Sequence, residues 1–193
     1  MLSSHLLYLH GFRSSPRSTK AQLTLEAVRA RAADMEIYCP ALSASPHQAI
    51  TDIEVHTAKW PKARTAIVGS SLGGFYATYL AERWGCKAVL LNPAVYPARD
   101  LAAHLGEQTL WQDPQTPFIF ERRYLDELRS LEVSSITHPD RYFAVIAKGD
   151  EVLDWREMTG HYSGARIRLL EGSDHALSDY PEHLGAVLDF LLC

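Results

Sequence analysis

The sequence predicts a mostly parallel α/β sheet covered by helices on both faces, in a single domain over residues 1–193. Short apolar runs alternate with segments whose apolar residues recur at helical spacing, and this alternation is typical of parallel strands joined by crossover helices. The chain also lacks internal repeats and low-complexity tracts, so one continuous sheet is expected. The six expected strands lie at 6–9, 36–39, 66–68, 88–91, 142–147 and 165–170.

The residues within the strands indicate their order in the sheet. Four of the six strands are almost wholly apolar, as strands buried on both faces are. The second and last strands instead carry Glu36, Arg166 and Arg168, which suit the edges of a sheet. With right-handed crossovers, the order 2-1-3-4-5-6 satisfies this division.

Helices are expected between the strands, from Thr19 onward and at 48–60, 72–84 and 155–162, with a last one near the C-terminus. Residues 93–140 interrupt the alternation. No sheet strand is expected there, only short helices at 99–105 and 122–131. Aromatic residues cluster in this insertion, which is therefore either a small lid over a site or a cover for the sheet edge. These aromatic residues are Trp111, Phe118, Phe120 and Tyr124.

Composition and charge exclude several classes of function. The formal net charge is −4, and no run of Lys or Arg suggests a nucleic-acid partner. No apolar run is long enough for a membrane span, and the N-terminus does not resemble a signal peptide. The three cysteines show no paired spacing and are expected to be reduced, which suits the cytoplasm. No metal-binding motif is present, and neither a metal nor a cofactor is expected.

The strongest motif is Gly69-Ser-Ser-Leu-Gly73, which follows the apolar run 66–68 and precedes a helical segment. A Gly-x-Ser-x-Gly pattern between a strand and a helix is typical of a nucleophile elbow, in which the central serine sits on a strained turn. The bare pattern arises by chance in about one chain of this length in fifteen. The flanking strand and helix therefore carry the prediction that Ser71 is a nucleophile.

Two further residues follow strand ends in the order expected for a hydrolytic triad. Asp150 comes just after the strand at 142–147 and His175 just after the strand at 165–170. The chain order Ser, Asp, His is that of the α/β-hydrolase triad, in which histidine is the base and aspartate orients it. Asp154 is the rival acid. Among the competing histidines, we interpret His10 as structural, while His161 and His183 lie in expected helices and His104 lies in the insertion.

Cleavage of an ester places negative charge on the carbonyl oxygen, and two N–H donors should face it. One is expected from the backbone of Leu72 and the other from Phe12, in the loop after the first strand. Loss of one such donor costs about 3–4 kcal/mol of transition-state stabilisation. Basic residues beyond this loop either bind an anionic part of the substrate or are solvated surface charges, which is the interpretation we favour. They are Arg13, Arg17 and Lys20.

Several longer segments occur together: Leu7-Tyr-Leu-His-Gly-Phe12 with Ser14-Ser-Pro-Arg-Ser18, Ile67-Val-Gly-Ser-Ser-Leu-Gly-Gly74 with 76–78, Asn92-Pro-Ala-Val95, and Gly149-Asp-Glu-Val-Leu-Asp154. In this combination the chain resembles the YqiA-type esterases, small bacterial α/β-hydrolases, across nearly its whole length. The resemblance implies a cytoplasmic esterase acting on short-chain carboxylic esters, and in some cases on acyl-CoA thioesters. It also implies catalysis by Ser71, Asp150 and His175. The match is weakest at 111–120, so it says least about the substrate.

The sequence therefore predicts a serine hydrolase that cleaves small-molecule carboxylic esters with short to medium acyl chains through an acyl-enzyme on Ser71. Two alternatives stay open. An acyl-CoA thioesterase would use the same triad, since both reactions pass through the same acyl-enzyme. A hydrolase-fold scaffold that binds a partner without catalysis is the alternative from another class.

Overall fold

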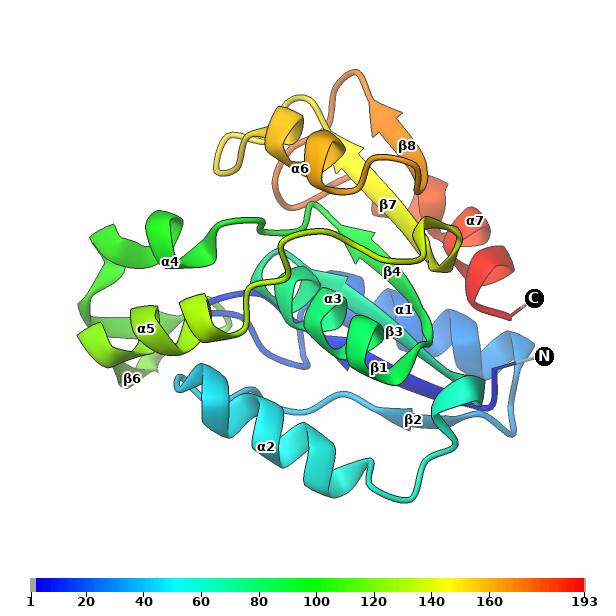
Figure 1. Ribbon diagram of the computed structural model, residues 1–193, viewed down its shortest axis with the longest axis horizontal. Helices are drawn as coiled ribbons and strands as arrows, with labels where there is room; N and C mark the ends of the chain where they lie inside the picture. The colour runs from blue at the N-terminus through cyan, green and yellow to red at the C-terminus, as the bar shows by residue number, and fades with distance from the viewer. Residues whose placement is uncertain (1–2, 193) are drawn as a thin grey trace.

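A computed structural model describes residues 3–192 of the chain. Its main sheet is entirely parallel and has the order β2-β1-β3-β4-β7-β8, which is the predicted order 2-1-3-4-5-6 (Figure 1). The strands are β1 (His5–Leu9), β2 (Glu36–Tyr38), β3 (Thr65–Ser70), β4 (Lys87–Leu91), β7 (Tyr142–Ala147) and β8 (Arg166–Leu170). The two strands with charged residues form the edges, as expected.

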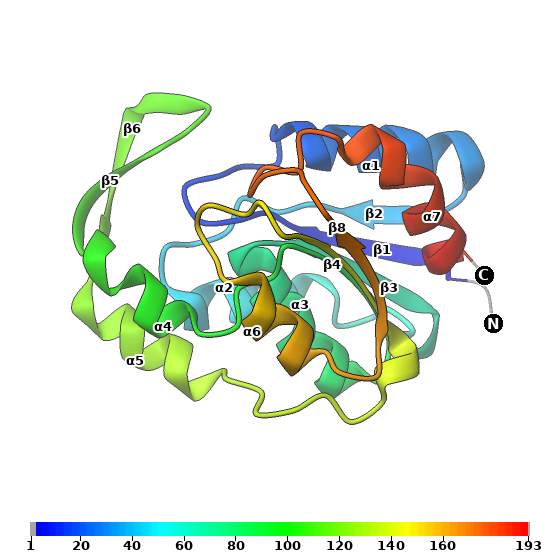
Figure 2. The same cartoon turned by 90° about the horizontal axis from the view of Figure 1, so that it is seen from above.

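Helices cover both faces of this sheet (Figures 1 and 2). One face is covered by α1 (Thr19–Arg31) and α7 (Tyr180–Leu192), and the other by α2 (Pro46–His56), α3 (Leu72–Trp84) and α6 (Trp155–His161). Successive residues of a strand point to opposite faces, so β3 contributes Ala66 and Val68 to the core under α1 and α7, and Ile67 to the other core. A short 3-10 turn, η1 (Lys62–Arg64), leads into β3.

The insertion at 93–140 differs from the expectation. It contains α4 (Pro97–Asp100), η2 (Leu101–His104), β5 (Gly106–Leu110), β6 (Asp113–Phe120), α5 (Arg122–Ser130) and η3 (Pro139–Arg141). The helix expected at 99–105 is a single α-turn followed by a 3-10 turn, whereas the helix expected at 122–131 is confirmed as α5. The expectation that the segment holds no strand is wrong, because β5 and β6 form a separate antiparallel hairpin.

Two prolines conceal this hairpin in the sequence. Pro114 and Pro117 lie within β6, and a residue without an N–H group disfavours a strand in the interior of a sheet. In a two-stranded ribbon each strand keeps one free edge, so proline is tolerated. The alternating burial typical of a strand appears after Pro117. Phe118 and Phe120 are at least half-buried, whereas Ile119 between them is exposed.

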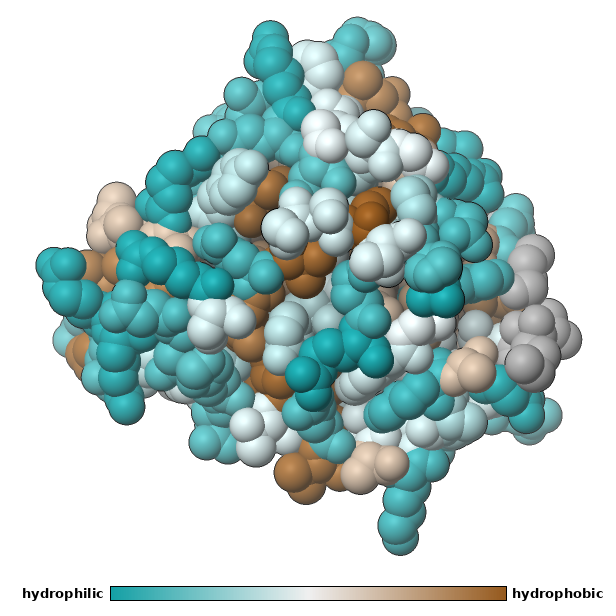
Figure 3. Space-filling view, in the orientation of Figure 1, coloured by the Kyte–Doolittle hydropathy of each residue, from teal (hydrophilic) through white to brown (hydrophobic). Residues whose placement is uncertain are grey.

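The hairpin lies beyond one end of the main sheet, apart from α1 and α7 (Figure 2). The backbone N–H of Trp111 at its turn donates to the carbonyl of Arg13, so the hairpin contacts the loop after β1. On the face shown in Figure 3 most of the surface is hydrophilic, and hydrophobic residues show mainly in furrows between polar ones. Among residues 3–192, none of the helices has the length and apolar character that crossing a membrane requires.

Candidate active site

Ser71 stands on the tight turn between β3 and α3. Its backbone has φ 55° and ψ −121°, a conformation that costs a non-glycine residue roughly 1–3 kcal/mol. The flanking glycines permit the close packing of this turn. A Cβ at Gly69 would lie 2.2 Å from the Gly73 carbonyl oxygen, and one at Gly73 would lie 2.0 Å from that of Leu9. The local sequence therefore dictates the turn that lifts Ser71 above the sheet.

The main chain of Ser71 is fixed on the side of β4. Its N–H donates to the Leu91 carbonyl at 3.0 Å, and its carbonyl accepts from the N–H groups of Gly74 at 2.8 Å and Ala94 at 3.0 Å. These bonds tie the elbow to the neighbouring strand and to the first residues of the insertion. The strained conformation is thus held by several surrounding groups rather than by the turn alone.

Three of the predicted residues are in hydrogen-bond contact. His175 Nε2 lies 3.0 Å from Ser71 Oγ, and His175 Nδ1 lies 2.8 Å from Asp150 Oδ2. The other carboxylate oxygen of Asp150 accepts from the N–H groups of Val152 and Leu153, both at 2.8 Å. The Asp150 side chain is fully buried and that of His175 is 21% exposed. With the Nδ1 proton donated to Asp150, Nε2 is free to accept the Ser71 proton.

The rival acid lies elsewhere. Asp154 is the N-cap of α6, and its carboxylate accepts from the Arg156 N–H at 2.8 Å. This local bond satisfies a helix end that would otherwise lack an acceptor. Asp150, rather than Asp154, is therefore the carboxylate in contact with His175.

The two predicted oxyanion donors flank the nucleophile. A Cβ at Gly11 would lie 3.1 Å from the Ser71 Cβ, so the loop that contains Phe12 passes directly against Ser71. Leu72 is the first residue of α3, where backbone N–H groups lack helical acceptors. Among the bonds formed within residues 3–192, neither the Phe12 nor the Leu72 N–H has a backbone acceptor. Neither group is therefore committed to a main-chain bond within the described residues.

His10 shapes the loop that carries Phe12. Its Nδ1 donates to the Gly11 carbonyl at 2.9 Å, and its Nε2 accepts from the Leu42 N–H at 3.1 Å. Burial lowers the pKa of His10, which favours the neutral ring that this pair of bonds requires. The interpretation of His10 as structural agrees with these contacts, since the ring ties the Phe12 loop to the loop before α2.

Asn92 was missed by the sequence analysis. It is completely buried at the end of β4 with φ 41°, a conformation that asparagine tolerates. Its Nδ2 donates to the carbonyls of Asp174 at 2.9 Å and His175 at 3.3 Å, and its Oδ1 accepts from the Ala147 N–H at 2.8 Å. One side chain thereby joins the ends of two strands to the His175 loop. The sequence signals were its place directly after a buried strand and its occurrence in the segment Asn92-Pro-Ala-Val95, but neither assigned it a role at the site.

Two more side chains hold the His175 loop. Glu151 Oε2 accepts from the His175 N–H at 3.0 Å, and Lys20 Nζ donates to the Ala176 carbonyl at 2.6 Å. Burial lowers the pKa of Lys20 to about 8, although the negative charge of Asp174 partly opposes this shift. Lys20 is therefore a structural contact of the histidine loop, and its interpretation as a solvated charge was wrong.

Arg13 is also engaged within the protein. Its Nε donates to the Thr109 carbonyl at 2.8 Å, and its guanidinium lies 4.0 Å from the ring centre of Trp111. The side chain pins the hairpin to the Phe12 loop, so the solvated interpretation was wrong here too. Arg17 is exposed, as expected.

Two cavities open beside Ser71 and His175. One, of about 580 Å³, is mainly apolar and continues under the insertion past Leu101 and Leu153; we call it the apolar cavity. The other, of about 500 Å³, extends towards α1 and is lined by Ser18, Thr19 and Lys20. Residues 3–192 contain no group of three or more His, Cys, Asp or Glu side chains placed to hold a metal ion.

Comparison with known families finds one that matches nearly the whole chain. A family model described as the uncharacterised protein family UPF0227 matches residues 5–192. The UPF0227 protein YE1706 of Yersinia enterocolitica is 23% identical over 192 residues, which cover 96% of this chain and 97% of that protein.

Solved structures share the fold at low sequence identity. A putative hydrolase from Agrobacterium vitis superposes with a TM-score of 0.78 at 18% identity, covering 99% of this chain and 91% of that one. A structure from work on the metagenome-derived lipolytic enzymes LipS and LipT gives a TM-score of 0.71 at 19% identity, and the match covers 99% of this chain and 94% of that one. Est1E from Butyrivibrio proteoclasticus with bound ferulic acid gives a TM-score of 0.70 at 13% identity, and the match covers 98% of this chain and 87% of that one. These likenesses show that the chain has the α/β-hydrolase fold.

Proposed function

The chain belongs to the UPF0227 family, and we propose that it is a serine esterase that hydrolyses carboxylic esters of short to medium acyl chains through an acyl-enzyme on Ser71. The observation that carries this proposal is the continuous contact from Ser71 Oγ through His175 to the buried Asp150, at 3.0 and 2.8 Å. Few structural roles require a serine on a strained turn, an imidazole and a buried carboxylate in one line.

The proposed reaction has two halves. In the first, His175 Nε2 takes the Ser71 proton as Oγ attacks the ester carbonyl, and the N–H groups of Phe12 and Leu72 stabilise the oxyanion. His175 then gives this proton to the alkoxy oxygen of the ester as its bond to the acyl carbon breaks, and the alcohol leaves. In the second half a water attacks the acyl-enzyme, with His175 as base, and the carboxylic acid is released.

An acyl-CoA thioesterase would use the same steps. The basic residues that could bind the charged leaving group are not all free for it, because Arg13 contacts the hairpin and Lys20 contacts the His175 loop. The contacts of these two side chains therefore favour an oxygen ester with an uncharged alcohol. Hydrolysis of a thioester and of its oxygen ester at equal concentration would separate the two functions.

Labelling with a fluorophosphonate probe tests the proposed function, since the probe reacts only with an activated serine. The wild type should be labelled, and Ser71→Ala and His175→Ala should not. Ser70→Ala is the matched control, because it removes the neighbouring hydroxyl and should retain labelling. Labelling of Ser71→Ala at the wild-type level would place the nucleophile elsewhere. A folded wild type without labelling would favour the non-catalytic scaffold.

A further inference from the structure

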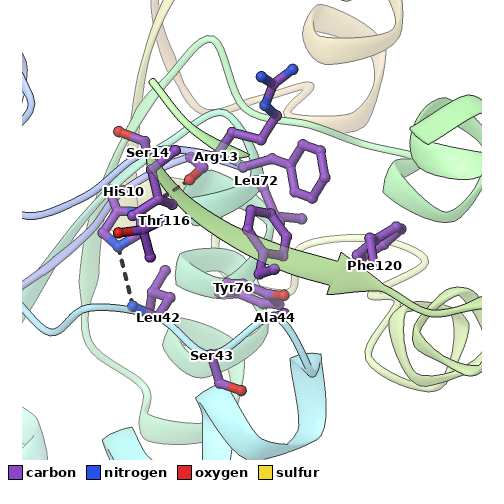
Figure 4. A pocket seen from close by; sticks show the side chains of 14 residues that line it. His10, Arg13, Ser14, Leu42, Ser43, Ala44, Leu72, Tyr76, Thr116 and Phe120 are labelled. Carbon is purple, nitrogen blue, oxygen red and sulfur yellow. Dashed lines mark hydrogen bonds between the residues drawn. The ribbon is translucent and has the colours of Figure 1, made fainter. Parts of the chain in front are cut away.

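A third cavity, of about 210 Å³, lies behind the Phe12 loop and beneath β6 (Figure 4); we call it the inner cavity. Neither Ser71 nor His175 lines it. Its apolar walls come from the Phe12 loop, α3, the hairpin and the loop before α2. They include Phe12, Leu42, Leu72, Tyr76, Phe118 and Phe120.

The Phe12 ring lies between the inner cavity and the apolar cavity at Ser71. Phe12 lines both. On the inner side its ring centre is 5.1 Å from that of Phe120 and 5.9 Å from that of Phe118. On the outer side it is 5.8 Å from the ring of His104, which lines only the apolar cavity. Leu72 and Arg13 also line both spaces, so the half-buried Phe12 side chain is one of three that separate them.

The polar groups of the inner cavity are mostly occupied by other parts of the protein. His10 Nε2 accepts from the Leu42 N–H, a bond visible in Figure 4. Arg13 donates to Thr109 and stacks on Trp111. Because the charged and ring nitrogens already have partners, the cavity suits an alkyl group better than an ion or a sugar.

We propose that the inner cavity can hold the distal methylenes of a saturated acyl chain, and that the Phe12 ring, which stands between it and the cavity at Ser71, lowers wild-type activity on medium-length chains relative to short ones. This inference rests on the proposed function, since it supposes an acyl group on Ser71. The size is sufficient: an apolar cavity of about 150 Å³ accepts benzene, so one of 210 Å³ holds the end of a medium-length chain.

Phe12→Ala tests the inference, because it removes the ring and keeps the backbone N–H. Each methylene that becomes buried should improve kcat/KM about fourfold. The ratio of kcat/KM for p-nitrophenyl decanoate to that for p-nitrophenyl butyrate should therefore rise about tenfold or more. Ile119→Ala is the matched control on the same hairpin, since Ile119 is 54% exposed, and it should leave the ratio unchanged.

Refilling the inner cavity should reverse the change. Ala44 lies on its wall, and Ala44→Phe added to Phe12→Ala should return the ratio towards the wild-type value. Phe12→Leu, a milder change, should give an intermediate ratio. An unchanged ratio in active Phe12→Ala overturns the inference, as does an unchanged ratio in active Phe12→Leu if the alanine variant is inactive. A wild type that the fluorophosphonate does not label would instead overturn the proposed function.

Discussion

Removal of the Asn92 amide should weaken both folding and catalysis. In Asn92→Ala the carbonyls of Asp174 and His175 lose a donor, and the Ala147 N–H loses its acceptor inside the protein. Two lost hydrogen bonds cost about 1 kcal/mol each, and an orphaned buried donor costs about 1–3 kcal/mol. The free energy of unfolding should therefore fall by roughly 3–5 kcal/mol, which moves the urea midpoint down by about 1.5–2.5 M at a slope near 2 kcal/mol/M.

The catalytic effect follows from the position of His175. Asn92 and Lys20 contact the carbonyl side of the His175 loop, and a displacement of about 1 Å in a reacting group costs about 100-fold in rate. We expect kcat for p-nitrophenyl butyrate to fall about 10- to 100-fold in Asn92→Ala, with a small change in KM. The loss should lie in kcat because, in the proposed mechanism, His175 acts in the chemical steps.

A second variant separates the two effects. Thr78 Oγ1 lies 2.8 Å from the Tyr162 hydroxyl between α3 and α6, away from His175, and both residues are buried. Thr78→Val should lower the free energy of unfolding by about 1–3 kcal/mol and leave kcat unchanged at a temperature where the protein is folded. The reasoning is refuted if Asn92→Ala keeps wild-type kcat, or if Thr78→Val lowers kcat as much.

Two further predictions concern charged groups of the site. Asp150→Asn should lower kcat by about 10³- to 10⁴-fold, because the amide no longer fixes the His175 tautomer. Asp154→Asn should change kcat less than twofold. Equal losses of kcat for the two variants in esterase assays would contradict the assignment of Asp150 as the acid that orients His175. The pKa of Lys20 is about 8 in the folded state, below its ordinary value of 10.5, so the unfolded chain binds more protons between these two pH values. The free energy of unfolding should therefore rise with pH across this window, and Lys20→Met should reduce that slope in urea titrations between pH 7.5 and 9.5; parallel slopes would refute the prediction.

The elements that sequence reasoning recovered are those encoded within a few residues. The elbow depends on contacts between Gly69, Gly73 and the adjacent strand, which any strand–turn–helix of this pattern must make. Asp150 and His175 follow directly once the strands are recognised, because parallel strands place their carboxyl ends at one edge of the sheet. Local spacing therefore predicted the sheet order and which residues meet at Ser71.

The residues that escaped prediction act across long separations. Asn92 joins β4 to the start of the His175 loop, and Lys20 reaches the same loop from α1, 156 positions away in the sequence. No periodicity marks such contacts, because they depend on how three loops converge above the sheet. The same holds for Arg13, whose partner Thr109 lies in a hairpin that two prolines disguise.

Phe12 combines both kinds of information. Its backbone N–H was predicted from its place after the first strand, whereas its ring depends on the hairpin and on η2. A substitution at Phe12 leaves the N–H in place and removes only the ring. Changes at Phe12 should therefore alter which acyl group reacts, whereas changes at Ser71 or His175 should decide whether any ester reacts. In the proposed mechanism, the side chain at position 12 can therefore change without loss of the N–H group that faces the oxyanion, provided that Gly11 keeps the loop backbone against Ser71.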